Sequence, residues 1–73
     1  MSPKQIDITH MQCSLFRMAQ TKWNKTPNEV SALFQRYDIL GFISDCYDSL
    51  HLSSYQLALE DIETLLHNKG VSV

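Results

Sequence analysis

Glycine and proline are scarce in this chain, which contains two of each among 73 residues. The glycines stand alone at positions 41 and 70, so the sequence has no glycine-rich loop that could cradle a phosphate group. It also shows no internal repeat and no low-complexity stretch. Its apolar residues recur instead at helical spacing, which predicts a small helical domain.

Cysteine is scarce as well, since Cys13 and Cys46 could form at most one disulfide. No apolar stretch approaches the roughly 20 residues needed to span a bilayer. Residues 1–7 are polar and no apolar run follows them, so we expect no secretory signal. We therefore expect a cytoplasmic protein with reduced thiols and no membrane association.

The length of the chain allows one domain, covering residues 1–73. A domain near 60 residues buries only about 60% of the surface that its unfolded chain exposes. Cores of this size rarely supply more than roughly 3–5 kcal/mol of net stability. Since no disulfide is expected, we expect self-association or a protein partner to supplement this core.

Charge is small in total but unevenly distributed, with a formal net charge of −2 at pH 7. Residues 1–36 carry five basic and two acidic side chains, a net +3, whereas residues 37–73 carry one basic and six acidic side chains, a net −5. Such asymmetry can steer a partner or favour head-to-tail self-association. The alternative is that solvated helix faces merely differ in sign.

The apolar periodicity predicts four helices and no strand, over about residues 7–23, 27–36, 39–50 and 54–69. The expected fold is therefore all-α, a compact four-helix domain with short connections. The residues predicted to face its core are Ile8, Met11, Leu15, Met18, Ala19, Val30, Leu33, Phe34, Tyr37, Ile39, Ile43, Cys46, Leu50, Tyr55, Ala58, Leu59, Ile62, Leu65 and Leu66. Gln12 also falls inside the first apolar arc, either at its edge or as a polar contact with a partner.

Capping signals mark the second helix at both ends. Thr26 and Glu29 stand at the spacing of a capping box, and Pro27 suits the first helical position. Asp38 should end this helix, because aspartate tolerates turn conformations and can bond its own backbone.

The last helix carries its own end signals. Ser53 and Gln56 predict a second capping box at its start. Gly70 should stop it in a left-handed conformation, with Val71 placed for the accompanying apolar contact.

A metal site is not expected. His10 and Cys13 stand three residues apart on a predicted helix, so their side chains are neighbours. A structural zinc site needs four ligands, however, and the remaining candidates do not converge on this pair. Cys46 should point into the core, and His51 lies well around its helix. We expect no metal and no cofactor.

Catalytic chemistry finds no support in the sequence either. Cys46 is interpreted as a small buried apolar residue, and Cys13 has only His10 and Arg17 nearby, unlike an activated thiol. No apolar pocket is apparent that would raise the pKa of the acids in the last helix. These acids are interpreted as a solvated face: Glu60, Asp61 and Glu63. We expect no enzymatic activity and no small-molecule substrate.

Nucleic-acid binding is the least favoured alternative. The second and third predicted helices, joined by a short turn, could imitate a helix-turn-helix. Ser44, Asp45 and Asp48 would then face the phosphates, and the two carboxylates would repel them. A small basic patch lies beside Trp23: Arg17, Lys22 and Lys25.

Several apolar residues fall outside the predicted core stripes. Leu57 faces away from the core between Glu60 and Asp61, and Leu52 sits beside His51 at the corner between the last two helices. Two aromatic residues rim the first stripe: Phe16 and Trp23. A contiguous patch would indicate an interface, whereas the alternative is local packing of all four. The first helix could instead pack on a second copy of itself or in a partner groove.

One motif carries a family resemblance. Cys46-Tyr47-x-x-Leu50-His51, followed by Glu60-Asp61-Ile62, resembles a small bacterial domain family of unknown function, numbered thirty-seven ninety-one, over about residues 8–69. The family is expected to favour glycine where this chain has Asp38.

The resemblance implies a compact helical domain without established enzymatic activity. It further implies that such proteins are encoded beside a protein similar to ADP-ribosyltransferases, as in a toxin–antitoxin pair. No catalytic residue is carried over, and His51 and Tyr55 become the polar positions most worth testing.

These observations together predict a bacterial protein-interaction module, antitoxin-like, that binds an ADP-ribosyltransferase-like protein. The predicted partner-binding residues are Leu57, Glu60, Asp61, His51 and Leu52. A homo-oligomeric structural protein is the alternative, and a nucleic-acid binder is less favoured.

Overall fold

The computed structural model describes residues 2–73 and places five helices and no strand within them. The helices are α1 (Pro3–Trp23), α2 (Pro27–Arg36), α3 (Ile39–Asp45), α4 (Tyr47–Leu50) and α5 (Tyr55–Asn68). The predicted all-α fold is confirmed. The third predicted helix, over residues 39–50, is divided into α3 and the single turn α4.

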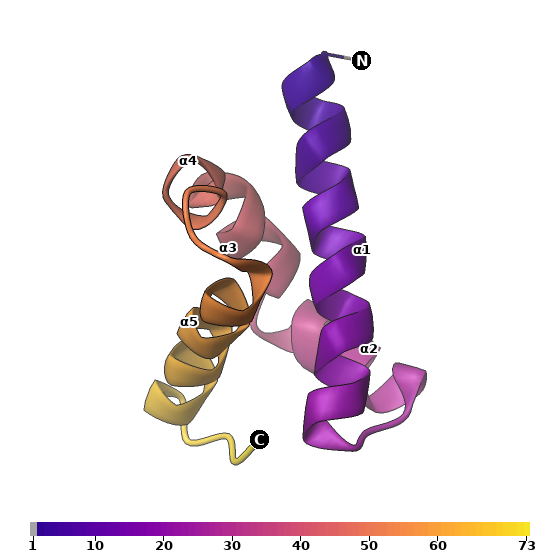
Figure 1. The fold of residues 1–73 in the computed structure, drawn as a ribbon. Helices are drawn as coiled ribbons and strands as arrows, with labels where there is room; N and C mark the ends of the chain where they lie inside the picture. The colour runs from indigo at the N-terminus through magenta and orange to yellow at the C-terminus, as the bar shows by residue number, and fades with distance from the viewer. Residues whose placement is uncertain (1) are drawn as a thin grey trace.

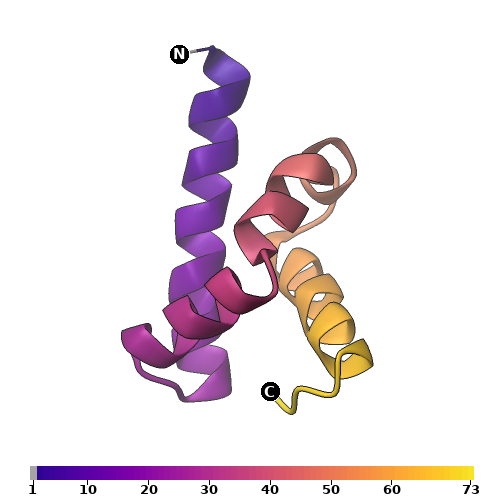
Figure 2. The same ribbon diagram turned by 180° about the vertical axis from the view of Figure 1, so that it is seen from behind.

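The long helix α1 forms one side of the molecule, and α3, α4 and α5 line the other (Figure 1). Seen from behind, α2 crosses α1 near the C-terminal end of α1 (Figure 2). Helix α1 contacts α2, α3 and α5, so it is the element against which the rest of the chain packs.

Local capping explains where α1 and α2 begin. The hydroxyl of Ser2 accepts a hydrogen bond from the backbone N–H of Gln5 at 3.3 Å, so α1 starts four residues earlier than predicted. Thr26 accepts from the N–H of Glu29 at 3.2 Å, and Glu29 accepts from the N–H of Thr26 at 3.2 Å. The predicted capping box is confirmed.

Asp38 ends the second helix as predicted, with a left-handed backbone at φ 50° and ψ 48°. This is the conformation that glycine adopts most easily, which fits the expectation of glycine at this position. A methyl group added at Gly41 would overlap the carboxylate of Asp38. The tight turn between α2 and α3 therefore requires glycine at position 41 as long as the Asp38 carboxylate keeps its place.

The division between α3 and α4 lies at Cys46, whose backbone leaves the helical region at φ −101° and ψ 10°. Hydrogen bonds continue on both sides of it, from Cys46 N–H to Phe42 C=O at 2.9 Å and from Leu50 N–H to Cys46 C=O at 2.8 Å. The break is thus a local bend in one helical segment.

The predicted capping box of Ser53 and Gln56 is wrong, because the N-cap of α5 is Ser54 and no capping box forms there. Ser53 N–H donates to Leu50 C=O at 3.1 Å, so Ser53 belongs to the turn that closes α4. Ser54 caps α5 instead, accepting from Leu57 N–H at 3.2 Å.

The end of α5 follows the prediction. Gly70 has a left-handed backbone at φ 85°. Its N–H bonds His67 C=O at 3.0 Å, and Val71 N–H bonds Leu66 C=O at 2.9 Å. These two bonds are those of a Schellman motif. Val71 packs against the core, as expected.

One continuous core joins the long helices, and α4 adds Leu50 to it. Its buried residues are Met11, Leu15, Ala19, Trp23, Val30, Phe34, Ile39, Ile43, Leu50, Ala58, Leu59, Ile62 and Leu66. Ile8 is buried as well. Six predicted core positions are only half-buried: Met18, Leu33, Tyr37, Cys46, Tyr55 and Leu65. Cys46 is thus not the fully buried residue that the sequence suggested.

Candidate protein-interaction surface

The outer side of α5 carries an exposed apolar residue between carboxylates. Leu57, Glu60 and Asp61 stand at helical positions i, i+3 and i+4, so they share one side of the helix. Leu57 is 52% exposed, and both carboxylates are exposed. We call these three residues the α5 face. Its expected position away from the core is confirmed.

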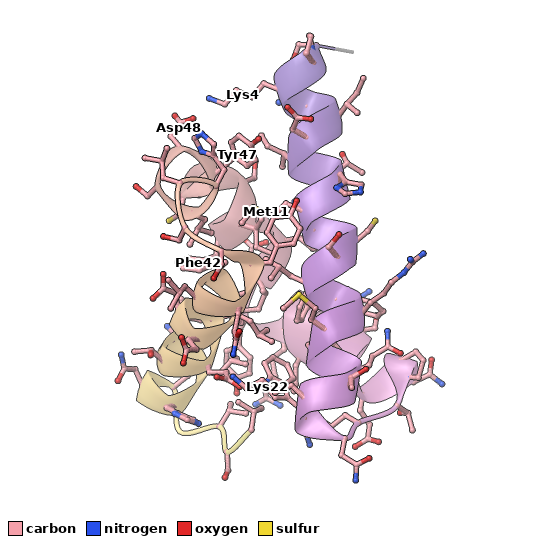
Figure 3. All side chains as sticks on the ribbon, in the orientation of Figure 1. Lys4, Met11, Lys22, Phe42, Tyr47 and Asp48 are labelled. Carbon is pink, nitrogen blue, oxygen red and sulfur yellow. The ribbon has the colours of Figure 1, made fainter. Side chains whose placement is uncertain are left out.

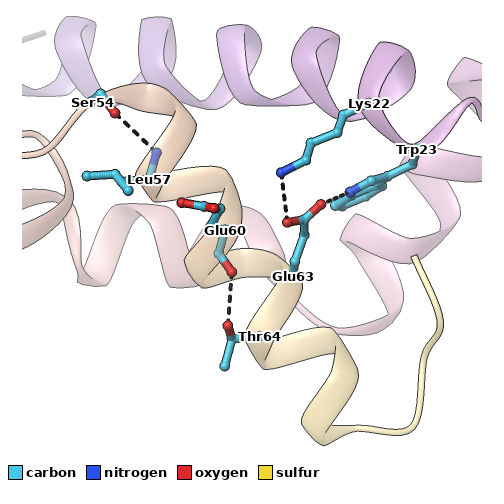
Figure 4. Close-up of polar contacts among 7 residues, drawn as sticks. All are labelled: Lys22, Trp23, Ser54, Leu57, Glu60, Glu63 and Thr64. Carbon is cyan, nitrogen blue, oxygen red and sulfur yellow. Dashed lines mark hydrogen bonds and ion pairs between the residues drawn. The ribbon is translucent and has the colours of Figure 1, made fainter.

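The flank of α5 next to its buried stripe is tied to α1 by Glu63. Its carboxylate accepts a hydrogen bond from the indole N–H of Trp23 at 2.7 Å and pairs with Lys22 Nζ at 3.0 Å (Figure 4). The Glu63 side chain is only 15% exposed. The interpretation of Glu63 as a solvated acid is therefore wrong.

Two features of the sequence could have indicated this contact. Glu63 follows Ile62 directly and lies four residues after Leu59, at the edge of the buried stripe. Trp23 is the only tryptophan, and a buried indole N–H usually finds a hydrogen-bond partner. Sequence reasoning missed the contact because it placed Trp23 at the rim, whereas Trp23 is 8% exposed.

The corner between α4 and α5 exposes Leu52 and His51. Leu52 is 81% exposed, the largest value among the exposed large apolar residues in the described part of the chain. His51 stacks on Tyr47 with ring centroids 4.8 Å apart, and its Nδ1 lies 2.8 Å from Tyr47 C=O. His51 thus covers the end of α4, which is a structural role.

Tyr47 and Tyr55 lie beside this corner and are both half-buried. Burial is the main cause that raises the pKa of Tyr47, followed by the negative charge of Asp7. Tyr55 packs against the core, as expected for a structural residue.

Phe16 and Trp23 pack locally. Both meet Phe34 edge to face, with ring centroids 5.5 Å away for Phe16 and 6.4 Å for Trp23. Of the four apolar residues outside the predicted stripes, Leu52 and Leu57 are the two that are exposed.

Gln12, which the sequence placed either at the edge of the apolar arc or in contact with a partner, bonds another helix of the same chain. Its side-chain amide donates to the backbone carbonyl of Leu40 at 2.9 Å, which links α1 to α3. Gln12 is therefore a polar contact within the chain.

Comparison with known proteins places the chain in a family. Residues 11–69 match the family model described as "Protein of unknown function (DUF3791)". The chain belongs to this family. The resemblance noted from the Cys46 and Glu60 motifs is thereby confirmed, although the match begins at residue 11 and not at residue 8. Neither a curated protein nor a solved structure matches the chain.

Side chains that could hold a metal do not gather in this DUF3791 domain. Within residues 2–73, no three His, Cys, Asp or Glu side chains lie together in a way that could hold an ion. Cys13 is exposed on α1 and Cys46 is half-buried between α3 and α4, and neither forms a disulfide. None of the helices described combines the length and hydropathy needed to cross a membrane.

The basic patch beside Trp23 is largely neutralised. Lys22 pairs with Glu63 at 3.0 Å, and Lys25 lies 4.0 Å from a carboxylate oxygen of Glu29. Among residues 2–73, Arg17 is the member of the patch that forms no ion pair. Among the predicted partner-binding positions, the exposed apolar side chains are Leu57 on the α5 face and Leu52 at the neighbouring corner.

Proposed function

We propose that this DUF3791 domain is a protein-interaction module without catalytic activity, and that its α5 face binds a protein partner. The main support is Leu57, which is 52% exposed and shares its helix side with two exposed carboxylates. An apolar anchor with a polar rim is the usual composition of a binding surface. The Glu63 contacts hold this helix in place before binding, which limits the entropy lost on association.

The proposed partner is the ADP-ribosyltransferase-like protein that the family resemblance implies as a genomic neighbour. In this proposal the chain acts in the bacterial cytoplasm as an antitoxin-like protein, which occludes or stabilises its partner. The chemistry of the α5 face predicts the complementary surface. It should offer an apolar pocket for Leu57, with Lys or Arg side chains at its edge for Glu60 and Asp61.

Leu52 and His51 extend this surface at the corner between α4 and α5. Leu52 is attached to a turn and not to a helix, so binding would have to order it further. We therefore expect Leu52 to contribute less affinity than Leu57.

Nucleic-acid binding is not proposed, because α3 would have to serve as the recognition helix. It spans seven residues, contains Asp45 and carries no Lys or Arg. A helix of this composition would contribute no cationic phosphate contact.

Co-purification tests the proposal. The tagged chain would be co-expressed with the ADP-ribosyltransferase-like neighbour as wild type, as Leu57→Asp and as Ile6→Asp. Ile6 is a matched control, because it is 55% exposed but lies on α1. Burying an unpaired charge at a central anchor should lower recovery of the partner by about tenfold or more for Leu57→Asp. Ile6→Asp should leave recovery unchanged.

Two results would contradict the proposal. Undiminished co-purification with Leu57→Asp would remove the α5 face as the binding surface. No co-purification with the wild-type chain would remove this partner. Thermal unfolding of each variant, followed by circular dichroism, checks that the fold is retained.

A further inference from the structure

Arg17 differs from most cations of the chain in its surroundings. Lys4, Lys22 and Lys25 each lie within 4.0 Å of a carboxylate oxygen. Arg36 lies over the ring of Tyr37, 5.7 Å from its centroid. Within residues 2–73, Arg17 and Lys69 are left without such a partner. Arg17 is exposed in the C-terminal half of α1, so its charge is available to another molecule.

Two open grooves adjoin Arg17. The first, of ≈ 460 Å³, lies between α1 and α5 and is lined by Arg17, Met18, Thr21, Lys22, Gln56 and Leu59. The second, of ≈ 290 Å³, lies between α1 and α3 and is lined by Gln12, Cys13, Phe16, Arg17 and Leu40. Neither lining includes a carboxylate, but Glu63 pairs with Lys22 of the first groove at 3.0 Å, so Arg17 is the cation of the lining that forms no ion pair among the described residues. We call the two together the Arg17 groove.

The chemistry of the Arg17 groove is apolar and cationic. Met18 and Leu59 contribute apolar surface on one side of Arg17, and Phe16 and Leu40 contribute it on the other. Leu40 is 44% exposed. A complementary ligand would carry an apolar side chain next to carboxylates.

The α5 face has this composition. Leu57 supplies the apolar side chain, and Glu60 and Asp61 supply carboxylates three and four residues later. Neither carboxylate forms an ion pair within the described residues. One molecule therefore carries both halves of a complementary pair, in line with its basic first half and acidic second half.

The two surfaces are also neighbours, since α1 and α5 pack together and both contribute to the groove. In a two-fold symmetric dimer, residues of one copy meet residues of the other twice, once in each direction. Each acidic α5 face could then meet the cationic groove of the other copy. This doubles the complementary charge contacts and leaves no open end for further growth.

We propose that two copies of this chain associate through this reciprocal contact, with the α5 face of each copy in the Arg17 groove of the other. The inference rests on the same α5 face as the proposed function, so the two forms of binding exclude one another. Binding of the protein partner would separate the two copies. The homodimer would then be the form that protects Leu57 from solvent while the partner is absent.

Sedimentation equilibrium of the purified chain tests this inference. The wild type should form dimers whose affinity falls as salt is added, because exposed charges are screened. Arg17→Glu should weaken association by about tenfold or more, since like charges would then face one another. Lys69→Glu is the matched control, because it reverses another unpaired cation outside the groove, and it should leave the affinity nearly unchanged.

A charge exchange gives the sharpest test. The variant Glu60→Arg with Asp61→Arg should be monomeric alone, as should Arg17→Glu. Mixed together, they should form a heterodimer, because every contact between the two variants again joins opposite charges. Failure of the mixture to associate would overturn the inference. So would a wild-type chain that stays monomeric up to about 1 mM, the weak end of specific association.

The outcomes separate this inference from the proposed function. Arg17→Glu should lose self-association but still co-purify with the protein partner, whereas Leu57→Asp should lose both. A monomeric wild type whose partner binding depends on Leu57 would refute the dimer alone. A charge-exchanged heterodimer without any co-purifying partner would refute the proposed partner alone.

Discussion

The two ends of α1 are joined to the rest of the chain by different kinds of contact. At the C-terminal end, Trp23 is buried and Glu63 of α5 binds both its indole N–H and Lys22. At the N-terminal end, Lys4 pairs with Asp48 of α4 at 3.0 Å, but their side chains are 56% and 78% exposed. Figure 3 shows this pair at one end of α1 and Lys22 at the other.

The difference identifies which part of the surface is firmly held. Hydrogen bonds to charged groups contribute about 1.5–3 kcal/mol each when shielded from water. Exposed ion pairs contribute only about 0–1 kcal/mol. Helix α5 is therefore well anchored and presents Leu57 in a fixed position. The corner that carries Leu52 joins the core through the buried Leu50, and its ion pair to α1 is exposed.

The largest expected effect on stability is the loss of core packing in α5, the helix that Glu63 anchors to α1. Ile62→Ala should lower the free energy of unfolding by about 3 kcal/mol, because Ile62 is fully buried and the substitution leaves a cavity. Urea denaturation followed by circular dichroism measures this. Leu57→Ala on the same helix should lower the free energy of unfolding by less than about 1 kcal/mol, since Leu57 is 52% exposed to solvent. Equal losses would mean that Leu57 belongs to the core.

The next effect concerns the bridge between α1 and α5. Glu63→Gln should lower the free energy of unfolding by about 1–2 kcal/mol, because the charge that binds Trp23 and Lys22 is lost. Glu60→Gln is the matched control on the outer side of α5 and should change stability by less than about 0.5 kcal/mol. If both variants behave alike, the bridge is not what anchors α5.

A smaller effect is expected where α5 ends. Gly70→Ala should lower the free energy of unfolding by about 1 kcal/mol. The backbone of Gly70 is at φ 85°, and alanine adopts this conformation only with strain. No atom lies within 4 Å of the added methyl group, so the cost is conformational and not steric. A thermal melt measures the change, and an unaltered midpoint would contradict the left-handed stop.

The smallest effect is expected at the N-terminal end of α1. Lys4→Ala should change the free energy of unfolding by less than about 0.5 kcal/mol, because its ion pair with Asp48 is exposed. Comparison of melts at low and high salt checks whether even this contribution is screened. A loss similar to that of Glu63→Gln would abolish the contrast between the two ends.

Much of the fold could be predicted from sequence because the signals were local. The apolar stripes located the helices, and Thr26, Asp38 and Gly70 mark ends that the structure confirms. The early start of α1 was missed, although Ser2 followed by Pro3 is itself a start signal.

The remaining errors concern features that depend on tertiary contacts. The bend at Cys46 contains no proline or glycine that would predict it from the sequence. The choice of Ser54 over Ser53 depends on Ser53 closing the previous turn. The role of Glu63 depends on where α1 places Trp23. The exposed positions of Leu52 and Leu57, by contrast, follow from helical periodicity and corner placement alone.

The most direct test of the α5 face is a nuclear magnetic resonance titration of the isotope-labelled chain with the unlabelled ADP-ribosyltransferase-like protein that we propose as its partner. We predict that the largest shift changes fall on Leu57, Glu60 and Asp61, with smaller changes at Leu52, while α2 remains unchanged. Changes centred on α2, or no changes at saturating partner, would contradict the assignment of this face as the binding surface.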